Sequence, residues 1–412
     1  MSEALKRKMV RDLVKDKAVH IRSSKLSLKE QMEVRRDVLS MLTHTTLSNI
    51  SNPLFNIESA STKNCENLIG KTETPLGIAG PLRVNGDYAK GEFFIPLATT
   101  EGALVASVNR GCNAIKLSDG AFVYIEQSGM TRAPLFHTAG LKESRKFVSF
   151  IKSHFKEISK RVHQTDIHLT LLSINPFVAG RNVFLRFVFD TQDAMGMNMV
   201  TLACDHVIKN YIEKETNIPC IALSGNLCTD KKASWMNKIE KRGYSVHAEV
   251  TIPEKIVKEV LKTNPRDFVD INTRKNLIGS ALAGSLGFNA HHANIIAAIF
   301  LATGQDMAHV AEASSGITTT ELTGHDLYIS VSLPDLPVGT IGGGTDLATQ
   351  KEALSILGVA GGGSPPGSNA KKFAEIIAAS VLAGEISLLA ALGSGDLAKA
   401  HRWLGRGEKK HD

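Results

Sequence analysis

The fold is organised around residues 275–306, KNLIGSALAGSLGFNAHHANIIAAIFLATGQD. This run carries formal charge only at its two ends and is otherwise rich in Ala, Gly, Ile and Leu. A helix that is apolar on all sides is buried, either in a large protein core or in a membrane. Polar residues at 289, 291, 292 and 294 interrupt the run, so it lacks the roughly 18 clean apolar residues of a membrane span. We therefore expect one or two core helices, with a break near Gly287 as the second alternative.

The polar side chains on this apolar element are candidates for a functional site. Polar groups are costly to bury unless they are paired. Lys275, His291, Asn294 and Asp306 therefore need partners, which a substrate or other site residues would supply. The alternative is that they are helix caps and core polar groups paired within the fold.

Length and composition limit the class of protein. A chain of 412 residues is too long for one simple core and predicts two or three domains. The formal charge of +7 comes from 48 basic and 41 acidic residues spread along the chain, which favours a small polyanionic ligand and does not indicate nucleic acid. Five cysteines without a CxxC pair predict reduced thiols in a cytoplasmic protein and no metal cluster. The charged N-terminus is neither a signal peptide nor a membrane anchor.

The change in residue composition along the chain predicts an α+β fold with a second domain inserted into the first. Residues 1–45 read as an amphipathic helical arm, with capping-box spacing at Ser27 and Glu30. Residues 46–132 and 224–395 are both rich in glycine and other small residues. We expect them to form one large domain around a central buried helix. The segment 133–223 alternates surface helices and strands, which predicts a small α+β unit. Residues 396–412 form a charged C-terminal segment.

Two carboxylate and ammonium motifs suggest acid–base chemistry. Glu101 lies in ATTEGALVAS (98–107), where poorly solvating neighbours would raise a carboxyl pKa toward a useful range. The alternative is an exposed glutamate at a helix start. Residues 224–232, SGNLCTDKK, end in a carboxylate and two ammonium groups. A fixed lysine there would stabilise an oxyanion, whereas the alternative is a solvated charge run.

Three further motifs are weaker alone. Residues 339–345, GTIGGGT, expose backbone amides but match neither a Rossmann fingerprint nor a P-loop, and could be only a turn. Residues 193–199, DAMGMNM, place three methionines at a helix start, where they would line a flat ring or fill a core. His401 lies in the charged tail, either as a proton donor that closes over a site or as a solvent histidine.

Taken together, the motifs closely resemble the 3-hydroxy-3-methylglutaryl-coenzyme A (HMG-CoA) reductase family, in the biosynthetic form of archaea and eukaryotes. The resemblance runs from about residue 50 to about residue 403. The motifs that carry it, in chain order, are ENLIG (66–70), PLGIAGPL (75–82), ATTEGALVASVNRG (98–111), DAMGMNM, SGNLCTDKK, NAHHAN (289–294), GQD (304–306) and GTIGGGT.

The resemblance implies that HMG-CoA is reduced to mevalonate and CoA by two NADPH, without a metal, in isoprenoid biosynthesis. It implies a cytoplasmic homodimer or homotetramer with shared active sites, and a ferredoxin-like small domain that binds the cofactor without a Rossmann fold. The implied catalytic residues are Glu101, Lys231, Asp306 and His401. The implied substrate-binding residues are Arg132, Ser224, Asp230, Lys232, Lys275, His291 and Asn294. The implied cofactor-binding residues are Asp193, Met195, Gly196, Met197, Asn198 and Met199, with Gly342, Gly343 and Gly344.

The sequence departs from the animal members of the family at several positions. Asp166 and Ile167 stand where those members place serine and arginine near the 2′-phosphate of the cofactor, so the choice between NADPH and NADH is open. Gly407 replaces a regulatory serine, Lys71 replaces a tyrosine that contacts CoA, and the membrane anchor is expected to be absent. The alternatives are an NAD-dependent degradative reductase that oxidises mevalonate, an acyl-CoA hydrolase or lyase without a nicotinamide, and a non-catalytic scaffold.

Overall fold

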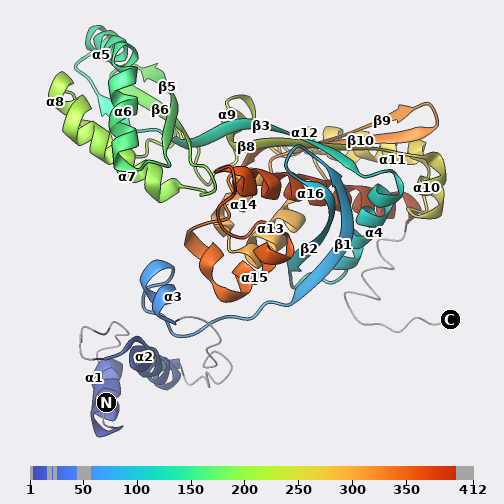
Figure 1. Ribbon diagram of the computed structural model, residues 1–412, viewed down its shortest axis with the longest axis horizontal. Helices are drawn as coiled ribbons and strands as arrows, with labels where there is room; N and C mark the ends of the chain where they lie inside the picture. Colours follow the sequence, from blue (N-terminus) through green and yellow to red (C-terminus); the bar gives the residue numbers. More distant parts are fainter. Residues whose placement is uncertain (1–2, 16–20, 22–25, 44–56, 396–412) are drawn as a thin grey trace.

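The computed structural model describes residues 3–15, 21, 26–43 and 57–395 (Figure 1). Three helices begin the chain: α1 (Glu3–Lys15), α2 (Leu28–Thr43) and α3 (Ile57–Lys63). The predicted capping box is confirmed, because the Ser27 N–H donates to Glu30 Oε2 at 3.0 Å and the Glu30 N–H donates to Ser27 Oγ at 3.3 Å. Arg36 of α2 donates to the carbonyl of Ile69 at 3.0 Å, which ties this arm to the ENLIG segment.

The large sheet supports most of the protein. Its strand order is β2-β1-β3-β8-β10-β9, antiparallel except for the short parallel pairing of β1 with β3. The strands are β1 (Leu76–Asn85), β2 (Lys90–Ala98), β3 (Ala121–Arg132), β8 (Arg242–Ile252), β9 (Ile317–Thr323) and β10 (Asp326–Leu336). Alternation of apolar and polar residues along β8 and β10 buries one face of the sheet, for example Val246 and Val331. β1 and β2 form a hairpin, with its turn just after Asn85.

The centre of the large domain is the helix α16 (Ser368–Ser394), which packs on the buried face of the sheet beside α4 (Leu104–Leu117). Among the described residues, it alone is long and apolar enough to cross a membrane by length and composition, but 83% of that window is buried inside the protein. The expectation that residues 275–306 form the centre is therefore wrong in part. The first half of that run lies at the surface, where Leu282 is 86% exposed, and the break near Gly287 is confirmed.

The remaining helices of the large domain are short and connect the strands. They are α9 (Trp235–Ile239), α10 (Glu254–Glu259), α11 (Pro265–Ile271), the π-helix η2 (Asn272–Gly279), α12 (Ser280–Leu282), α13 (His292–Thr303), the 3-10 helix η3 (Met307–His309), α14 (Val310–Ala313), the 3-10 helix η4 (Gly343–Asp346) and α15 (Ala348–Ile356).

A second sheet with its own hydrophobic cluster lies at one end of the molecule (Figure 1). Its elements are β4 (Leu135–His137), α5 (Leu141–Ser153), α6 (Phe155–Thr165), β5 (Thr170–Ala179), β6 (Asn182–Asp190), α7 (Met197–Val207), the π-helix η1 (Ile208–Ile212), α8 (Glu213–Thr216) and β7 (Cys220–Ala222). This βαββαβ order, with the antiparallel strand order β7-β4-β6-β5, is a ferredoxin-like arrangement.

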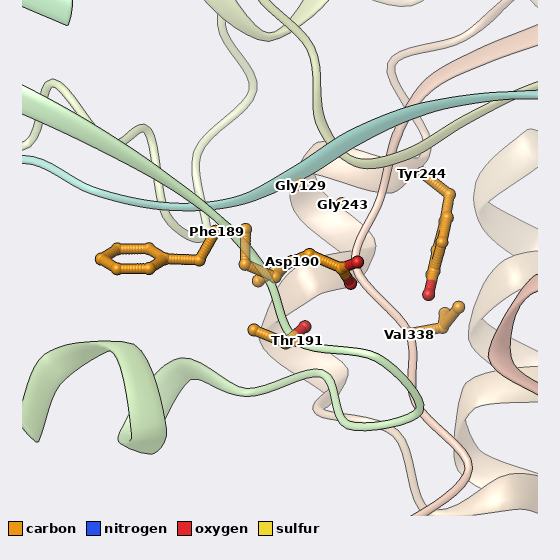
Figure 2. A pocket seen from close by; sticks show the side chains of 8 residues that line it. Gly129, Phe189, Asp190, Thr191, Gly243, Tyr244 and Val338 are labelled. Atoms are coloured by element: carbon orange, nitrogen blue, oxygen red, sulfur yellow. The ribbon is translucent and has the colours of Figure 1, made fainter. Parts of the chain in front are cut away.

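One strand belongs to both sheets. β3 pairs with β8 as far as Gly129 and with β6 from Met130 onward. At this junction Gly129 and Gly243 line a cavity of ≈ 10 Å³ together with Asp190 and Tyr244, as Figure 2 shows. That volume is about the least that holds one water molecule. A Cβ on Gly129 would lie 2.6 Å from the carbonyl oxygen of Phe189, so only glycine lets the two sheets approach here.

Candidate active site

The loop that carries Lys231 connects β7 to α9 and ends beside Asp306. Lys231 Nζ lies 2.8 Å from Asp306 Oδ2, and the two side chains are 43% and 35% exposed. Asp306 also caps η3 by accepting the Ala308 N–H at 3.0 Å. Partial burial alone would raise the pKa of Asp306, but the hydrogen bonds from Lys231 and Ala308 hold it below its usual value. The pair therefore presents a fixed ammonium group at the surface of the chain.

Asp230 anchors the same loop through three cationic or N–H-bearing side chains. Arg242 Nη2 lies 2.8 Å from Asp230 Oδ1, His309 Nε2 lies 3.0 Å from the same oxygen, and Arg132 Nη1 lies 3.5 Å from Oδ2. Burial raises the pKa of Asp230, but these partners together lower it to about 2. The predicted substrate residues Arg132 and Asp230 thus lie together, with the Asp230 side chain only 17% exposed.

The pKa of Asp230 predicts an acid-dependent stability. A carboxyl whose pKa is lowered from 3.8 to about 2 in the folded state stabilises the fold above pH 3.8, and this contribution is lost as the pH falls toward 2. We expect Asp230→Asn to lower the free energy of unfolding by about 2 kcal/mol at pH 5, with a difference from the parent that shrinks toward pH 2. Urea unfolding of both proteins across this range measures it. A difference that stays constant with pH would contradict the assignment.

Glu101 belongs to a second group of residues, together with His291 and Asn294. It lies in the loop between β2 and α4, and its Oε1 accepts from Asn294 Nδ2 at 3.3 Å. His291 Nε2 lies 2.9 Å from the carbonyl oxygen of Gly384, which can only accept, so Nε2 carries the proton. Nδ1 is then left to face Asn294 Nδ2 at 3.4 Å. Of the two readings of Glu101, the single chain shows the exposed glutamate and not the poorly solvated one.

Lys275 lies on η2 near this second group. Its Nζ donates to Asn276 Oδ1 at 3.1 Å, and Asn276 in turn donates to Asn272 Oδ1 at 2.7 Å. Burial lowers the pKa of Lys275, against the opposing effect of the buried carboxylate of Glu385. A π-helical turn of this kind interrupts regular helix geometry and is frequent at functional sites.

The two groups lie at opposite ends of α13. His291 and Asn294 are at its N-terminal end, and Asp306 follows its C-terminal end. A helix of 12 residues is about 18 Å long. A single chain therefore does not bring Glu101 to Lys231 and Asp306, which fits the expectation of active sites shared between subunits. His401, the fourth predicted catalytic residue, lies outside the described residues.

The predicted cofactor segments do lie side by side. Ala194 and Ile341 form a parallel β-bridge, and the Thr340 N–H donates to the carbonyl of Asp193 at 2.8 Å. Gly342 and Gly343 are exposed, with no heavy atom within 4 Å of a Cβ placed on either. α7 begins here at Met197, and its N-cap residue Gly196 has no side chain to cap it, so its first N–H groups are available to an anion. Open glycine backbone beside a helix N-terminus fits a dinucleotide.

Two residues of these segments serve the fold instead. The Asp193 carboxylate is buried and accepts the N–H groups of Gly363, Gly367 and Ala370 at 2.7–3.0 Å. Met197 is buried and its Sδ accepts from Arg242 at 3.0 Å. Both side chains are therefore paired within the fold, whereas Asn198 is exposed and Met195 and Met199 are partly exposed.

The remaining predicted substrate residues lie on the Lys231 loop. Ser224 Oγ lies 3.4 Å from Cys228 Sγ, and Lys232 is exposed, with its Nζ donating to the carbonyl of Asp230 at 3.3 Å. Gly344 packs closely against Gly304, the residue that ends α13. A Cβ on Gly344 would lie 2.6 Å from the carbonyl oxygen of Gly304.

Sequence reasoning missed two features. Asn109, Arg110, Asn113 and Lys116 of α4 line a cleft of ≈ 420 Å³, a polar stripe whose helical spacing was visible in the sequence. Glu385 is fully buried on α16 and accepts the N–H groups of Ala290 and His291 at 2.9 and 2.7 Å. A charged residue within an apolar stretch of helix was the available signal for Glu385, because a buried charge must be paired.

Comparisons with known proteins agree on one family. The family model described as hydroxymethylglutaryl-coenzyme A reductase matches residues 31–406. The 3-hydroxy-3-methylglutaryl-coenzyme A reductase of Aeropyrum pernix is 54% identical over 92% of this chain and 90% of its own, and that of Pyrococcus abyssi is 51% identical over 91% and 92%. A class II reductase of Streptococcus pneumoniae, solved with NADPH bound in open conformations, superposes with a TM-score of 0.64 over 95% of this chain and 97% of its own at 20% identity, which is a likeness of fold.

Proposed function

The chain belongs to the hydroxymethylglutaryl-coenzyme A reductase family, and from this premise we propose that it reduces HMG-CoA to mevalonate and CoA with two NADPH. The observation that carries the proposal is the ion pair of Lys231 with Asp306, at 2.8 Å. Lys231 lies on the loop that matches the family motif SGNLCTDKK, and Asp306 lies in the motif GQD. The test is the fall in absorbance at 340 nm with HMG-CoA present, measured with NADPH and with NADH and in both directions. Faster oxidation of mevalonate with NAD would favour the degradative alternative, and no HMG-CoA-dependent change would favour a hydrolase or lyase.

The proposed chemistry assigns one proton or charge to each residue. Two NADPH molecules, bound one after the other, would each supply one hydride. The thioester carbonyl oxygen becomes an oxyanion, which the Lys231 ammonium stabilises while Asp306 keeps that ammonium in place. The hemithioacetal then breaks its C–S bond, and the CoA thiolate takes a proton from His401. The aldehyde oxygen takes the last proton from Glu101, leaving mevalonate.

We propose that each active site is shared between two subunits of a homodimer or homotetramer. Glu101, His291 and Asn294 of one subunit would meet the partner subunit's Lys231. The separation of the two groups along α13 supports this, because neither group alone holds both the acid and the ammonium. Contact with a partner would also bury Glu101, which the acid role requires.

The cleft on α4 is proposed to hold the CoA moiety. α4 begins three residues after Glu101, so a substrate whose thioester lies at Glu101 can extend along this helix. Lys116 and Arg110 supply positive charge for the phosphates, although Lys116 also contacts Glu92 at 3.0 Å and Arg110 donates to Ser387. We expect Lys116→Ala to raise KM for HMG-CoA about three- to tenfold, with kcat unchanged, since it removes a contact made equally before and during reaction. Initial rates against HMG-CoA concentration measure both constants, and an unchanged KM would contradict the assignment.

Asp166 is expected to weaken NADPH binding. Its Oδ1 accepts the His168 N–H at 2.9 Å, and His168 Nδ1 lies 3.3 Å from Gln192, which adjoins the cofactor segment 193–199. A carboxylate here repels a 2′-phosphate. Asp166→Asn should therefore lower KM for NADPH about threefold or more while leaving KM for NADH within about twofold. Equal changes for both cofactors would show that Asp166 does not face the 2′-position.

A cytoplasmic location is also part of the proposal, and cell fractionation tests it.

A further inference from the structure

A buried polar network lies directly beneath the Lys231 loop. Arg242 of β8 and Glu312 of α14 have no exposed side-chain surface, and Arg242 Nη1 lies 2.6 Å from Glu312 Oε1. Asn237 of α9 is also buried and donates to Glu312 Oε2 at 3.3 Å and to Asp335 of β10. Burial and the charge of Glu312 raise the pKa of Asp335 well above its usual range.

The loop above the network has an unfavourable backbone. Asn226, Thr229 and Lys231 have φ angles of 64°, 58° and 61°, in the left-handed region that glycine tolerates best. For a β-branched residue such as Thr229 this conformation is rare. Such a conformation persists only where the surrounding structure over-determines it, and strain of this kind clusters at functional sites.

Three consecutive residues of the loop are each tied to a different member of the network. The Lys231 N–H donates to Glu312 Oε1 at 3.2 Å, and Thr229 Oγ1 donates to Asn237 Oδ1. Between them, Asp230 Oδ1 accepts from Arg242 Nη2 at 2.8 Å. Glu312 Oε1 therefore bridges the buried guanidinium of Arg242 and the backbone of the catalytic lysine.

The same cluster resembles a cation site, because ligand atoms of Asp230, His309 and Glu312 lie within 4.8 Å of one another. Arg242 already contacts both carboxylates at 2.8 and 2.6 Å and supplies the positive charge that a cation would bring. The contacts to the loop backbone remain to be explained, and a cation does not explain them.

We propose that Glu312, held by Arg242, is a positioning residue that fixes the strained backbone of residues 229–231 and so sets where Lys231 presents its ammonium group. The role of that ammonium in HMG-CoA reduction rests on the proposed function. The fixing of the backbone does not.

The test compares Glu312→Asp and Glu312→Gln with a matched control, Glu375→Gln. Glu312→Asp keeps the charge opposite Arg242 but withdraws the carboxylate by one methylene, so it should fold. Glu375 is another fully buried glutamate that accepts backbone N–H groups, at residues 87–89 of a hairpin remote from this loop. Glu312→Gln keeps the length of the side chain and removes the charge, and serves if the aspartate variant fails to fold.

The first readout is tryptic cleavage of the native protein after the exposed residues Lys231 and Lys232. Cleavage of a native loop requires local opening, so loss of the anchor should raise its rate about tenfold or more in either Glu312 variant. The Glu375→Gln control should leave cleavage at this loop within about twofold. An unchanged cleavage rate in both Glu312 variants overturns the proposal, whether or not the protein reduces HMG-CoA.

The second readout is a double-mutant cycle with Lys231→Ala. In the parent, either Glu312 substitution should lower kcat about tenfold or more, with KM for HMG-CoA within about threefold. If Glu312 acts through Lys231, the same substitution should cost less than about twofold in the Lys231→Ala background. If the Glu312 substitution caused only a general structural defect, its loss of kcat would multiply with that of Lys231→Ala. That outcome overturns the proposal. An inactive parent would refute the proposed function and leave the cleavage readout to decide the positioning.

Discussion

Lys231→Ala is expected to lower kcat by about two to three orders of magnitude, because a preorganised oxyanion-stabilising group contributes about 2.7–4 kcal/mol. The structure supports a large value. Lys231 is held by Asp306 at 2.8 Å, yet its side chain is 43% exposed and can reach a substrate. Little reorganisation is then needed when charge develops on the carbonyl oxygen. Steady-state rates at saturating HMG-CoA and NADPH measure the loss, and near-normal turnover would refute the oxyanion assignment.

Lys232→Ala is the matched control for this prediction. Lys232 is the neighbouring ammonium on the same loop, is also exposed, and contacts the Asp230 carbonyl at 3.3 Å. Its predicted role is to hold the hydroxymethylglutaryl end, so its loss should raise KM for HMG-CoA with a small effect on kcat. If both variants changed the same constant by the same factor, the loop would act only through its total charge.

The second large effect is recovery of activity in a mixed dimer. We expect Glu101→Gln and Lys231→Ala to be nearly inactive separately. When the two chains are co-expressed with different tags and the mixed dimer is purified, about half of the parent activity should return. One of its two sites then combines an intact Glu101 with the partner subunit's intact Lys231, and the other site carries both substitutions. Activity of the doubly tagged dimer per site measures the recovery.

The control for the mixed dimer pairs two substitutions from the same group, Lys231→Ala and Asp306→Asn. These residues form an ion pair within one chain, so every site of that mixed dimer keeps one defect. No recovery is expected. If the Glu101→Gln and Lys231→Ala pair also failed to recover, or if a monomer were fully active, the shared site would be excluded.

Local structure could be predicted from the sequence because it depends on patterns among residues that are close together in the chain. Ser27 and Glu30 formed their capping box, and the alternation of helices and strands in residues 133–223 predicted the α+β unit found there. Its ferredoxin-like order was implied only by the family resemblance. The predicted break near Gly287 appears as the gap between α12 and α13. Each of these outcomes depends on residues close together in the chain.

Long-range placement was beyond the sequence. The apolar run at 275–306 was expected to form the central helices, and only packing decided that α16 takes the centre. The motif resemblance gathered Glu101, Lys231 and Asp306 in one place, but it could not show that α13 separates them within a chain. The network of Arg242, Glu312 and Asn237 was missed because buried polar residues look ordinary until their partners are known.

The position of α16 at the end of the described chain has a consequence for biosynthesis. Its Glu375 binds the hairpin turn 288 residues earlier, and its Glu385 binds the loop that carries His291. A ribosome that adds about 5–20 residues per second delivers Glu375 roughly 15–60 s after the hairpin. During that interval the nascent large domain lacks its central helix, so the apolar face of its sheet is uncovered. Chaperones would have to shield that face until translation is nearly complete.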